Sequence, residues 1–403
     1  MDGGGVCHEP LPARAGGSSG RGRPVRVLLA TDSFPPKIDG VSDTAAIVAR
    51  VLGRFGHTAR VIAPAPGPEE VEGARVARIG SIPAPLYPEL RLGVALDRVV
   101  RIARSRWDGA IVLTPGPIGA TVALALRRET LLLNIYTTDI PRYLQTYGMH
   151  QFVGAATWLL RRMAERSERT LCPTRFVEEE LRALGFPRLE VWGRGVDTEL
   201  FNPGRRSAAM RARLAGGEPE RPLVLYVGRL AKEKRLETLA EVVEALPGVR
   251  LALVGDGPER ARLEELFAGK PVVFTGYLRG VELAEAFASA DVFVFPSWTD
   301  TFGQVVLQAM ACGLPPVVVT GSATAELVSP GVCGLHVAPG RPGALAAAVR
   351  RLVEDEGMRR SMGMAAAAHA RRYSWEALVQ RLVELLSPGD APGQVDVPGA
   401  LAK

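Results

Sequence analysis

The sequence has few of the residues that bind metals or cross-link a chain. It contains four cysteines and five histidines in 403 residues, and neither type clusters at the spacing of a metal site. The sequence also has no Asp-x-Asp pair. The cysteines are scattered, at Cys7, Cys172, Cys312 and Cys333. This pattern predicts no metal site, and it favours a reduced, cytoplasmic compartment over a disulfide-bonded secreted protein.

Long apolar runs and concentrated positive charge are also missing. No run reaches the roughly 18 apolar residues of a membrane-spanning helix, so any membrane contact is expected to be peripheral, at the inner face of the cell membrane. The net charge is +6, and no basic block with interleaved aromatic residues is present, which argues against nucleic-acid binding. With 47% hydrophobic residues, the chain is long enough for two domains with full cores.

The Gly-x-Gly-x-x-Gly spacing of dinucleotide-binding enzymes is absent as well. Residues 25–64 predict a strand, a loop with Pro and Gly, a helix and a second strand. That order is the opening unit of a Rossmann-like domain. Because its loop lacks the glycine spacing, the unit argues against a dehydrogenase.

The strongest positive signal lies between residues 291 and 321. The apolar run DVFVFP is followed by a polar loop, a helix predicted at about 303–312, and a second buried strand, PPVVV. At such a corner the first free N–H groups of the helix face a bound phosphate, and Asp300 offers a carboxylate to sugar hydroxyls. The residues just before this helix are Asp300, Thr301, Phe302 and Gly303. Any doubly wound domain has corners of this kind, so the stretch alone leaves an ordinary corner open.

The same stretch resembles a known family. The order is Ser297, two residues, Asp300, one residue, Phe302-Gly303, three residues, Leu307-Gln308-Ala-Met-Ala, one residue, Gly, one residue, Pro. It is similar to the signature of the retaining, nucleotide-sugar-dependent glycosyltransferases of family four. The resemblance implies the α/β fold called GT-B, in which two Rossmann-like, doubly wound domains face a cleft. It also implies a nucleotide-sugar donor and no metal or other cofactor.

Three positions depart from the family pattern. The family has two glutamates eight positions apart, which fall here on Asp300 and Gln308. The resemblance assigns the first to the donor sugar's hydroxyls and the second to the nucleotide ribose, where an amide loses the strength of a charged hydrogen bond. The family's Tyr-His-Thr-Asp strand end is here Tyr136-Thr137-Thr138-Asp139, so Thr137 replaces a histidine near the transferred sugar.

Further donor contacts follow from the same resemblance. The pattern Gly-Arg-Leu, three residues, Lys places Arg229 and Lys234 in one loop, where two cations neutralise the charge that grows on a departing diphosphate. Gly40, before the first helix, is implied to bring its amide near the donor phosphates. Beside the base we expect Gly255, Gly276 and Leu278, although glycines at strand ends are also ordinary turn residues.

Two arginine-rich segments of the first half bear on the acceptor. Residues 95–107 place arginines at three-residue spacing along one side of a predicted helix, and residues 152–170 mix arginines with Trp158 and other apolar residues. The arginines considered are Arg98, Arg101, Arg104, Arg161 and Arg162. Basic amphipathic helices of this kind lie on anionic lipid. Ordinary helices with a buried stripe and a solvated arginine face fit equally, and both interpretations stay open.

The motif order divides the chain. We predict disordered tails at 1–24 and 389–403, an N-terminal Rossmann-like acceptor domain at 25–203, a linker at 204–221 whose middle is able to form a short helix, and a C-terminal Rossmann-like donor domain at 222–373. The resemblance implies that a last helix, 374–388, crosses back to the first domain. The loop at 192–203 resembles the family's interdomain crossover, and Thr174 and Ser374 are predicted N-caps.

These observations imply a retaining hexosyltransferase with a GDP- or UDP-linked donor and a lipid or lipid-linked glycan as acceptor. It is similar to α-mannosyltransferases and sulfoquinovosyl-type lipid glycosyltransferases. Two alternatives remain open. One is a transferase for a soluble natural-product acceptor, and the other is a nucleotide-sugar-binding subunit without turnover, since three cleft positions are altered. An epimerase has less support because the motif order belongs to the transferases.

Overall fold

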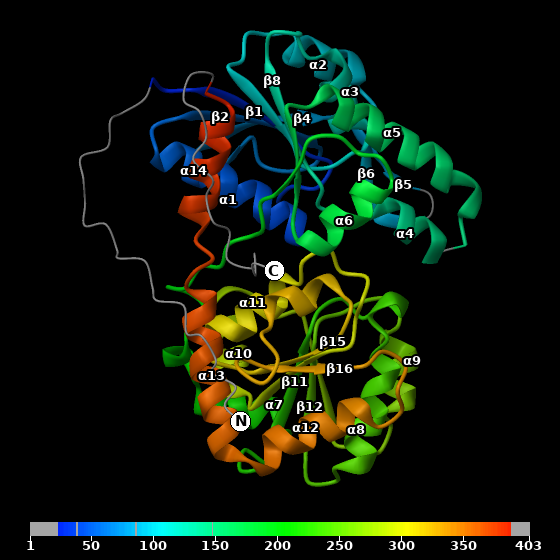
Figure 1. Cartoon of the computed structure of the whole chain (residues 1–403), viewed down its shortest axis with the longest axis vertical. Helices are drawn as coiled ribbons and strands as arrows, with labels where there is room; N and C mark the ends of the chain where they lie inside the picture. Colours follow the sequence, from blue (N-terminus) through cyan, green and yellow to red (C-terminus); the bar gives the residue numbers. More distant parts are fainter. Residues whose placement is uncertain (1–22, 38, 85–86, 147, 388–403) are drawn as a thin grey trace, which may run out of the picture.

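The computed structural model describes residues 23–37, 39–84, 87–146 and 148–387, which form two α/β domains stacked end to end (Figure 1). Each domain has a central, mostly parallel sheet with helices on both faces, which confirms the predicted doubly wound class. The two predicted tails lie outside the described residues, apart from residues 23 and 24, which have no regular structure.

The N-terminal sheet has the strand order β10-β9-β8-β7-β1-β2-β4-β3, and every pair is parallel except β3 with β4. Its strands are β1 (Arg26–Ala30), β2 (Thr58–Pro64), β3 (Glu70–Val71), β4 (Ala74–Ile79), β7 (Gly109–Val112), β8 (Leu131–Ile135), β9 (Arg169–Cys172) and β10 (Leu189–Val191). A separate hairpin joins β5 (Ser81–Ala84) to β6 (Tyr87–Gly93). The predicted strand, helix and strand over 25–64 are β1, α1 and β2.

Alternation along β1 divides the core of this domain into two layers. Val27 and Leu29 face the layer beneath α1 and α14, whereas Leu28 and Ala30 face the layer beneath α2 and α3. The helices of the domain are α1 (Gly40–Arg54), α2 (Leu96–Ala103), α3 (Pro117–Ala125), α4 (Ile140–Thr146), α5 (Val153–Arg166) and α6 (Arg175–Ala183), with the 3-10 turn η1 (His150–Phe152). Thr174 caps α6 by accepting from Val177 N, as the sequence predicts.

The C-terminal sheet is fully parallel, in the order β13-β12-β11-β14-β15-β16. Its strands are β11 (Leu223–Val227), β12 (Arg250–Val254), β13 (Val272–Gly276), β14 (Val292–Phe295), β15 (Pro316–Val319) and β16 (Leu335–Val337). Its helices are α8 (Ala240–Ala245), α9 (Arg260–Leu266), α10 (Gly280–Ser289), α11 (Gln304–Ala311), α12 (Ala344–Glu354) and α13 (Glu356–Ala370). The 3-10 turns are η2 (Pro203–Arg205), η3 (Lys232–Lys234), η4 (Leu236–Leu239) and η5 (Ala323–Leu327).

The expected linker is a packed part of the C-terminal domain. Its middle forms α7 (Ala208–Leu214), and Met210 and Leu214 are buried in that domain's core. Arg211 of α7 donates to the carbonyl oxygen of Ser289 and to Asp291 Oδ2, both at 2.8 Å. The charged residues around α7 are typical of a mobile linker. The buried side chains of Met210 and Leu214 and the Arg211–Asp291 ion pair nevertheless hold the segment against the domain.

The chain crosses between the domains twice, at residues 192–203 and at residues 373–375. Ser374 caps the last helix, α14 (Trp375–Leu385), by accepting from Ala377 N, as predicted. This helix lies against α1 of the N-terminal domain (Figure 1). At the crossings Trp192 packs on Trp375 with ring centroids 6.2 Å apart, and Val196 N donates to the carbonyl oxygen of Tyr373. The two crossings therefore lie side by side.

Candidate active site

The candidate site lies where the strand order of the C-terminal sheet reverses. The chain proceeds outward from β11 to β12 on one side and to β14 on the other, so the carboxyl ends of these strands form a topological switch point. Arg229 follows β11, Gly255 follows β12, and Asp300 follows β14. The sequence-predicted donor residues of this domain are thus brought to one edge of the sheet.

Lys234 and Asp300 form a half-buried ion pair in this edge. The distance from Lys234 Nζ to Asp300 Oδ1 is 2.7 Å, and the two side chains are 15% and 21% exposed. Ser297, which is fully buried, donates its hydroxyl to the other carboxylate oxygen of Asp300 at 2.5 Å. Lys234 Nζ also lies 5.8 Å from the centroid of the Phe295 ring. These contacts fix the direction of both charges.

Arg229 is held beside this pair by its own loop. Its Nη1 atom lies 3.8 Å from Glu233 Oε1, and its carbonyl oxygen accepts from the Tyr226 hydroxyl at 3.1 Å. Tyr226 in turn stacks on Phe295, with ring centroids 6.0 Å apart. The end of β11 is therefore anchored to β14, and Arg229 and Lys234 are both set at the edge that holds Asp300.

Helix α11 begins one residue later than predicted, after Gly303. Gly303 has a φ of +87°, and a Cβ atom there would lie 2.5 Å from Thr324 Cγ2, so only glycine fits. The Phe302 side chain is buried in the domain core, which leaves only its backbone to face a ligand. Gln308 is half-buried, and within the described chain its side chain has no hydrogen-bond partner.

The expected base-side glycines serve the packing of the strand ends. A Cβ atom on Gly255, which has a φ of +135°, would lie 1.9 Å from the carbonyl oxygen of Gly228. Gly255 N donates to the carbonyl oxygen of Gly276 at 2.9 Å, which ties β12 to β13. Leu278 is 7% exposed and packs in the domain core. Because the glycines have no side chain and that of Leu278 is buried, the predicted contact with the base would be made by backbone atoms.

The N-terminal domain meets this edge at Thr137, after β8. Its hydroxyl donates to the carbonyl oxygen of Leu113 at 2.6 Å, and its own carbonyl oxygen accepts from Thr301 Oγ1 at 3.1 Å. The Thr137 side chain is buried and turned toward the end of β7. Thr301 thus touches the opposite domain as well as preceding α11.

Gly40 opens α1, and two of the first N–H groups of this helix, those of Val41 and Ser42, are already occupied. The N-cap residue, Asp39, accepts from Val41 N and Ser42 N at 3.1 and 2.8 Å. Burial acts to raise the pKa of Asp39, but Lys37 and the hydrogen bonds from Ser33 and Ser42 keep it below its usual value. A phosphate near Gly40 would therefore face a carboxylate, and Lys37, 3.1 Å from Asp39 Oδ2, is part of the same cluster.

Sequence reasoning missed Arg194 as a site residue. It lies in the first interdomain crossing, is 7% exposed, and donates to the carbonyl oxygens of Gly40 and Thr137 at 3.3 and 3.4 Å. The available signal was a single charge in the otherwise uncharged run Trp-Gly-Arg-Gly-Val, at 192–196. Such a residue is buried only when its surroundings hold polar groups for it.

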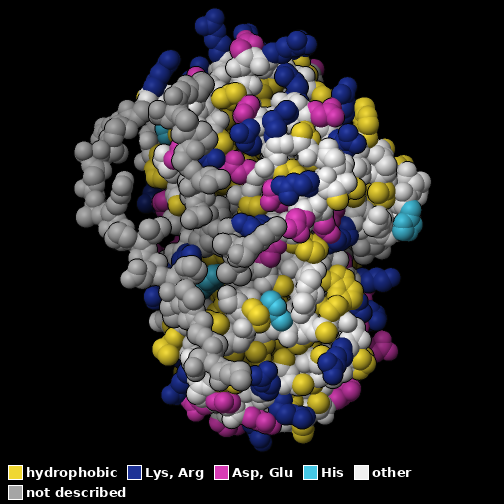
Figure 2. All heavy atoms as spheres, in the orientation of Figure 1, with side chains coloured by type: hydrophobic (Ala, Val, Ile, Leu, Met, Phe, Trp, Pro, Cys, Tyr) yellow, Lys and Arg dark blue, Asp and Glu magenta, His cyan; other side chains and the backbone are white. Residues whose placement is uncertain are grey.

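The predicted acceptor arginines lie on the surface of the N-terminal domain, away from the switch point. Arg98 donates to the carbonyl oxygen of Arg78, Arg101 pairs with Asp97 on α2, and Arg104 follows that helix. Arg161 and Arg162 of α5 both pair with Glu165. In Figure 2, Lys and Arg side chains are scattered over the upper half of the molecule, among acidic and hydrophobic ones.

Aromatic side chains accompany the arginines of α5. Trp158 is 63% exposed and Phe152, just before the helix, is 54% exposed, whereas Leu160 and Met163 are buried. The apolar residues of this segment therefore divide between a core face and an outward face. The buried stripe and the arginines paired with Glu165 fit an ordinary amphipathic helix, and exposed Trp158 and Phe152 add apolar surface to its outward side.

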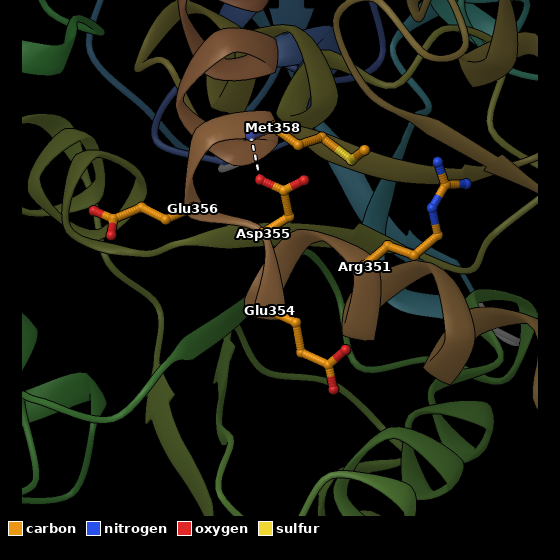
Figure 3. A pocket seen from close by; sticks show the side chains of 5 residues that line it. All are labelled: Arg351, Glu354, Asp355, Glu356 and Met358. Carbon is orange, nitrogen blue, oxygen red and sulfur yellow. Dashed lines mark hydrogen bonds between the residues drawn. The ribbon is translucent and has the colours of Figure 1, made fainter.

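Other candidate sites are less well formed. A depression between α12 and α13 is lined by Arg351, Glu354, Asp355, Glu356 and Met358, but Figure 3 shows Glu354 and Glu356 pointing in different directions. Asp355 is engaged as the N-cap of α13, where it accepts from Met358 N. Over the described ranges no group of three or more His, Cys, Asp or Glu side chains is placed to hold a metal ion. Nor does any helix there have the length and apolar character to cross a bilayer.

Comparison with known proteins decides the family. The family model described as glycosyltransferase family 4 matches residues 38–200, and that of glycosyl transferases group 1 matches residues 213–369. The GDP-mannose-dependent alpha-mannosyltransferase of Mycobacterium tuberculosis is 37% identical over 370 residues, covering 89% of this chain and 95% of that protein. The chain belongs to the glycosyltransferases. The enzyme is also 36% identical over 371 residues to the sulfoquinovosyl transferase SQD2 of Arabidopsis thaliana, covering 89% of this chain and 73% of that protein.

A third relative of this glycosyltransferase matches over a shorter range. It is the GDP-mannose-dependent alpha-(1-6)-phosphatidylinositol dimannoside mannosyltransferase of M. tuberculosis, 34% identical over 232 residues, covering 56% of this chain and 59% of that protein. Solved structures confirm the GT-B fold. Sucrose-phosphate synthase of Thermosynechococcus elongatus has a TM-score of 0.76 at 23% identity, covering 90% of this chain and 98% of that one. HepE of Anabaena, solved with UDP and glucose, has a TM-score of 0.73 at 22% identity, covering 90% and 99%.

Proposed function

We propose that this glycosyltransferase moves a hexose-type sugar from a GDP- or UDP-linked donor to a hydroxyl group of a lipid or lipid-linked glycan, with retention of the anomeric configuration. The observation that carries the proposal is the cluster of Arg229, Lys234 and Asp300 at the switch point of the second sheet. Two relatives whose names specify GDP-mannose, and HepE with bound UDP, support this choice of donor class.

In the proposed reaction the bond between the sugar's C1 and the diphosphate oxygen breaks while a bond from C1 to the acceptor oxygen forms on the same face. Arg229 and Lys234 neutralise the charge that grows on the departing diphosphate, in place of a divalent cation. Asp300 accepts hydrogen bonds from the sugar hydroxyls, and Gln308 binds the ribose. The proton of the acceptor hydroxyl passes to an oxygen of the diphosphate, so no side-chain nucleophile is needed.

The choice of a lipid acceptor rests on the surface of α5. Exposed Phe152 and Trp158 accompany Arg161 and Arg162, and this combination binds the interface of an anionic bilayer. The relative that acts on phosphatidylinositol dimannoside, a lipid, points the same way. A peripheral position at the cytoplasmic face of the membrane brings such an acceptor to the N-terminal domain without a membrane-spanning segment.

The reaction is tested by transfer assays. A thermal-shift screen against GDP-, UDP-, ADP- and dTDP-sugars selects the donor, which is then incubated with diacylglycerol, phosphatidylinositol or a soluble aglycone. We expect labelled sugar in the lipid fraction, with the donor's anomeric configuration in the NMR spectrum of the product. Labelled soluble aglycone alone would contradict the lipid acceptor. Donor binding without hydrolysis or transfer would favour a binding subunit.

Membrane contact is tested separately by vesicle flotation. We expect the enzyme to float with anionic vesicles, less so at high salt because the Debye length shortens, and not with neutral vesicles. Trp158→Ser should lower recovery several-fold. Met364→Ser, at an apolar residue of α13 that is 70% exposed in the other domain, is the matched control and should leave recovery unchanged. Equal recovery with neutral and anionic vesicles would contradict the proposal.

A further inference from the structure

Arg194 lies among residues that were assigned to the donor for other reasons. Its guanidinium contacts the carbonyl oxygens of Gly40, proposed near the phosphates, and of Thr137, proposed near the transferred sugar. Asp300 is close enough to influence its charge. Three elements from both domains, the start of α1 and the ends of β8 and β14, thus surround one arginine that belongs to the crossing between the domains.

The charge of Arg194 is poorly compensated. Asp39, Asp43 and Asp300 all lie in its surroundings, yet it forms an ion pair with none of the residues that the structure describes. Its two hydrogen bonds, at 3.3 and 3.4 Å, are long, and they use two of the five N–H donors of a guanidinium. Burial lowers the pKa of Arg194 to about 10, and the three carboxylates offset only part of that effect.

Arg211, in the C-terminal domain, shows how this chain satisfies a buried arginine that has a packing role. Its side chain is 13% exposed and donates to three carbonyl oxygens and to the carboxylate of Asp291, at 2.6–2.9 Å. Removing a buried cation from water is costly unless such partners replace the water. Arg194 is more buried than Arg211 and has fewer and longer bonds. An arginine that served only to hold the domains together would be expected to have better hydrogen-bond partners than Arg194 has.

We propose that Arg194 is a third cation of the donor site and that it binds an oxyanion of the donor. The oxyanion is either an oxygen of the diphosphate or an acidic substituent on the transferred sugar, and the planar fork of the guanidinium suits both. The inference rests on the proposed function insofar as the ligand is a nucleotide sugar. Because Arg194 belongs to neither sheet but to the crossing, its contact couples donor binding to the relative position of the domains.

Calorimetry with Arg194→Gln tests the contact. The ligands are the plain nucleoside diphosphate, the same nucleotide with a neutral hexose, and the same nucleotide with a hexuronic acid. Loss of one charge-assisted hydrogen-bonding group is expected to weaken binding about 10- to 100-fold. If the diphosphate supplies the oxyanion, all three ligands weaken equally. If a sugar substituent supplies it, the acidic sugar nucleotide alone weakens. Arg194→Lys, which keeps the charge, should bind more tightly than Arg194→Gln.

Arg211→Gln is the matched control, since it removes a buried arginine remote from the switch point. It should lower the melting temperature and leave all three dissociation constants unchanged. Arg194→Met keeps the length of the side chain and serves if Arg194→Gln does not fold. The inference would be overturned if a folded Arg194→Gln or Arg194→Met variant bound all three ligands within twofold of the wild-type affinity. Failure of the wild-type enzyme to bind any nucleotide would instead overturn the proposed function.

Discussion

Lys234 Nζ lies 2.7 Å from Asp300 Oδ1, so the cation proposed for the leaving group and the carboxylate proposed for the sugar are one ion pair. The two residues are 66 positions apart in the sequence and come from opposite sides of the switch point. Each holds the other in direction, and Ser297 holds the far oxygen of the carboxylate. Substituting either residue therefore changes both of their proposed contacts with the donor.

The two leaving-group cations should be needed for turnover. We expect Arg229→Ala and Lys234→Ala each to lower kcat by about two to three powers of ten, the effect of losing one preorganised stabiliser of developing charge. The fold should survive, as judged by thermal melting. Because Lys234 and Asp300 are paired, the double variant Lys234→Ala/Asp300→Ala should lose less than the sum of the single effects.

Lys270→Ala is a suitable control for this measurement. Lys270 is also paired with a carboxylate, Glu244, in the same domain, but it lies after α9, outside the edge that holds Asp300. The kcat of Lys270→Ala should equal that of the wild type. If both Arg229→Ala and Lys234→Ala kept wild-type rates with the true donor, their assignment to the leaving group would be wrong.

Gln308 is expected to bind the ribose, a contact that does not depend on the sugar. Gln308→Glu should tighten the plain nucleoside diphosphate by roughly 1 kcal/mol, about fivefold, because it restores a charge-assisted hydrogen bond, provided the diphosphate does not repel the carboxylate. Gln308→Ala should weaken the diphosphate and the full donor alike. Asp300→Ala should weaken the full donor more than the plain diphosphate, since its carboxylate is assigned to the sugar and the diphosphate is affected only through the loss of its ion pair with Lys234. Calorimetry with both ligands separates these outcomes, and the reverse pattern would show the two roles to be misassigned.

Gly303 should tolerate no side chain. Gly303→Ala adds a Cβ atom at 2.5 Å from Thr324 Cγ2 in a backbone with a φ of +87°. The left-handed conformation and the overpacking together should cost about 2–5 kcal/mol of unfolding free energy. Adding Thr324→Ser removes the clashing methyl group and should recover the overpacking part only. Denaturant unfolding of the single and double variants measures both parts. An alanine variant as stable as the wild type would contradict this account of α11's first residue.

Asp43, in the first turn of α1, should make stability depend on pH. Desolvation, followed by the charge of Asp39, raises the pKa of Asp43 from 3.8 to about 6. Because the pKa of Asp43 is higher in the folded state, the folded state favours the protonated carboxyl. The stability that this proton contributes is full below pH 3.8 and is lost as the pH rises to about 6. Asparagine stays neutral at every pH, so the melting temperature of Asp43→Asn, relative to that of the wild type, should rise as the pH increases over that interval. The gain should be about 1 kcal/mol or less, because Asp43 keeps contact with solvent. A difference that is constant with pH would contradict it.

The features predicted well from the sequence are local ones. The strand β1 and the N-caps Thr174 and Ser374 each depend on a few neighbouring residues, so the local sequence is enough to predict them. The family resemblance also assigned Arg229 and Asp300 to one donor site, and both follow strands of the same parallel sheet, whose carboxyl ends lie on one edge.

The features that were missed depend on residues far apart in the chain. The α7 segment has the composition of a linker, and only the surface it covers shows that it is packed. The cap that Glu326 gives to α6 joins residues about 150 positions apart, with Glu326 Oε2 accepting from Arg175 N at 2.9 Å. The surroundings of Arg194 likewise combine α1, β8 and β14. No local pattern contains such contacts.

The Trp192–Trp375 contact has a mechanical consequence for the cleft. The two crossings run side by side and are joined at this contact. We therefore expect them to act as one hinge with a single axis and not as two independent linkers. We expect such a paired hinge to let the domains rotate about its axis and to resist sliding and twisting. Displacement about a hinge grows with distance from its axis, so we expect the interdomain contacts farthest from the two crossings to open first. Arg194 belongs to one of the crossings, so we expect it to move less than donor-site residues that lie farther from them.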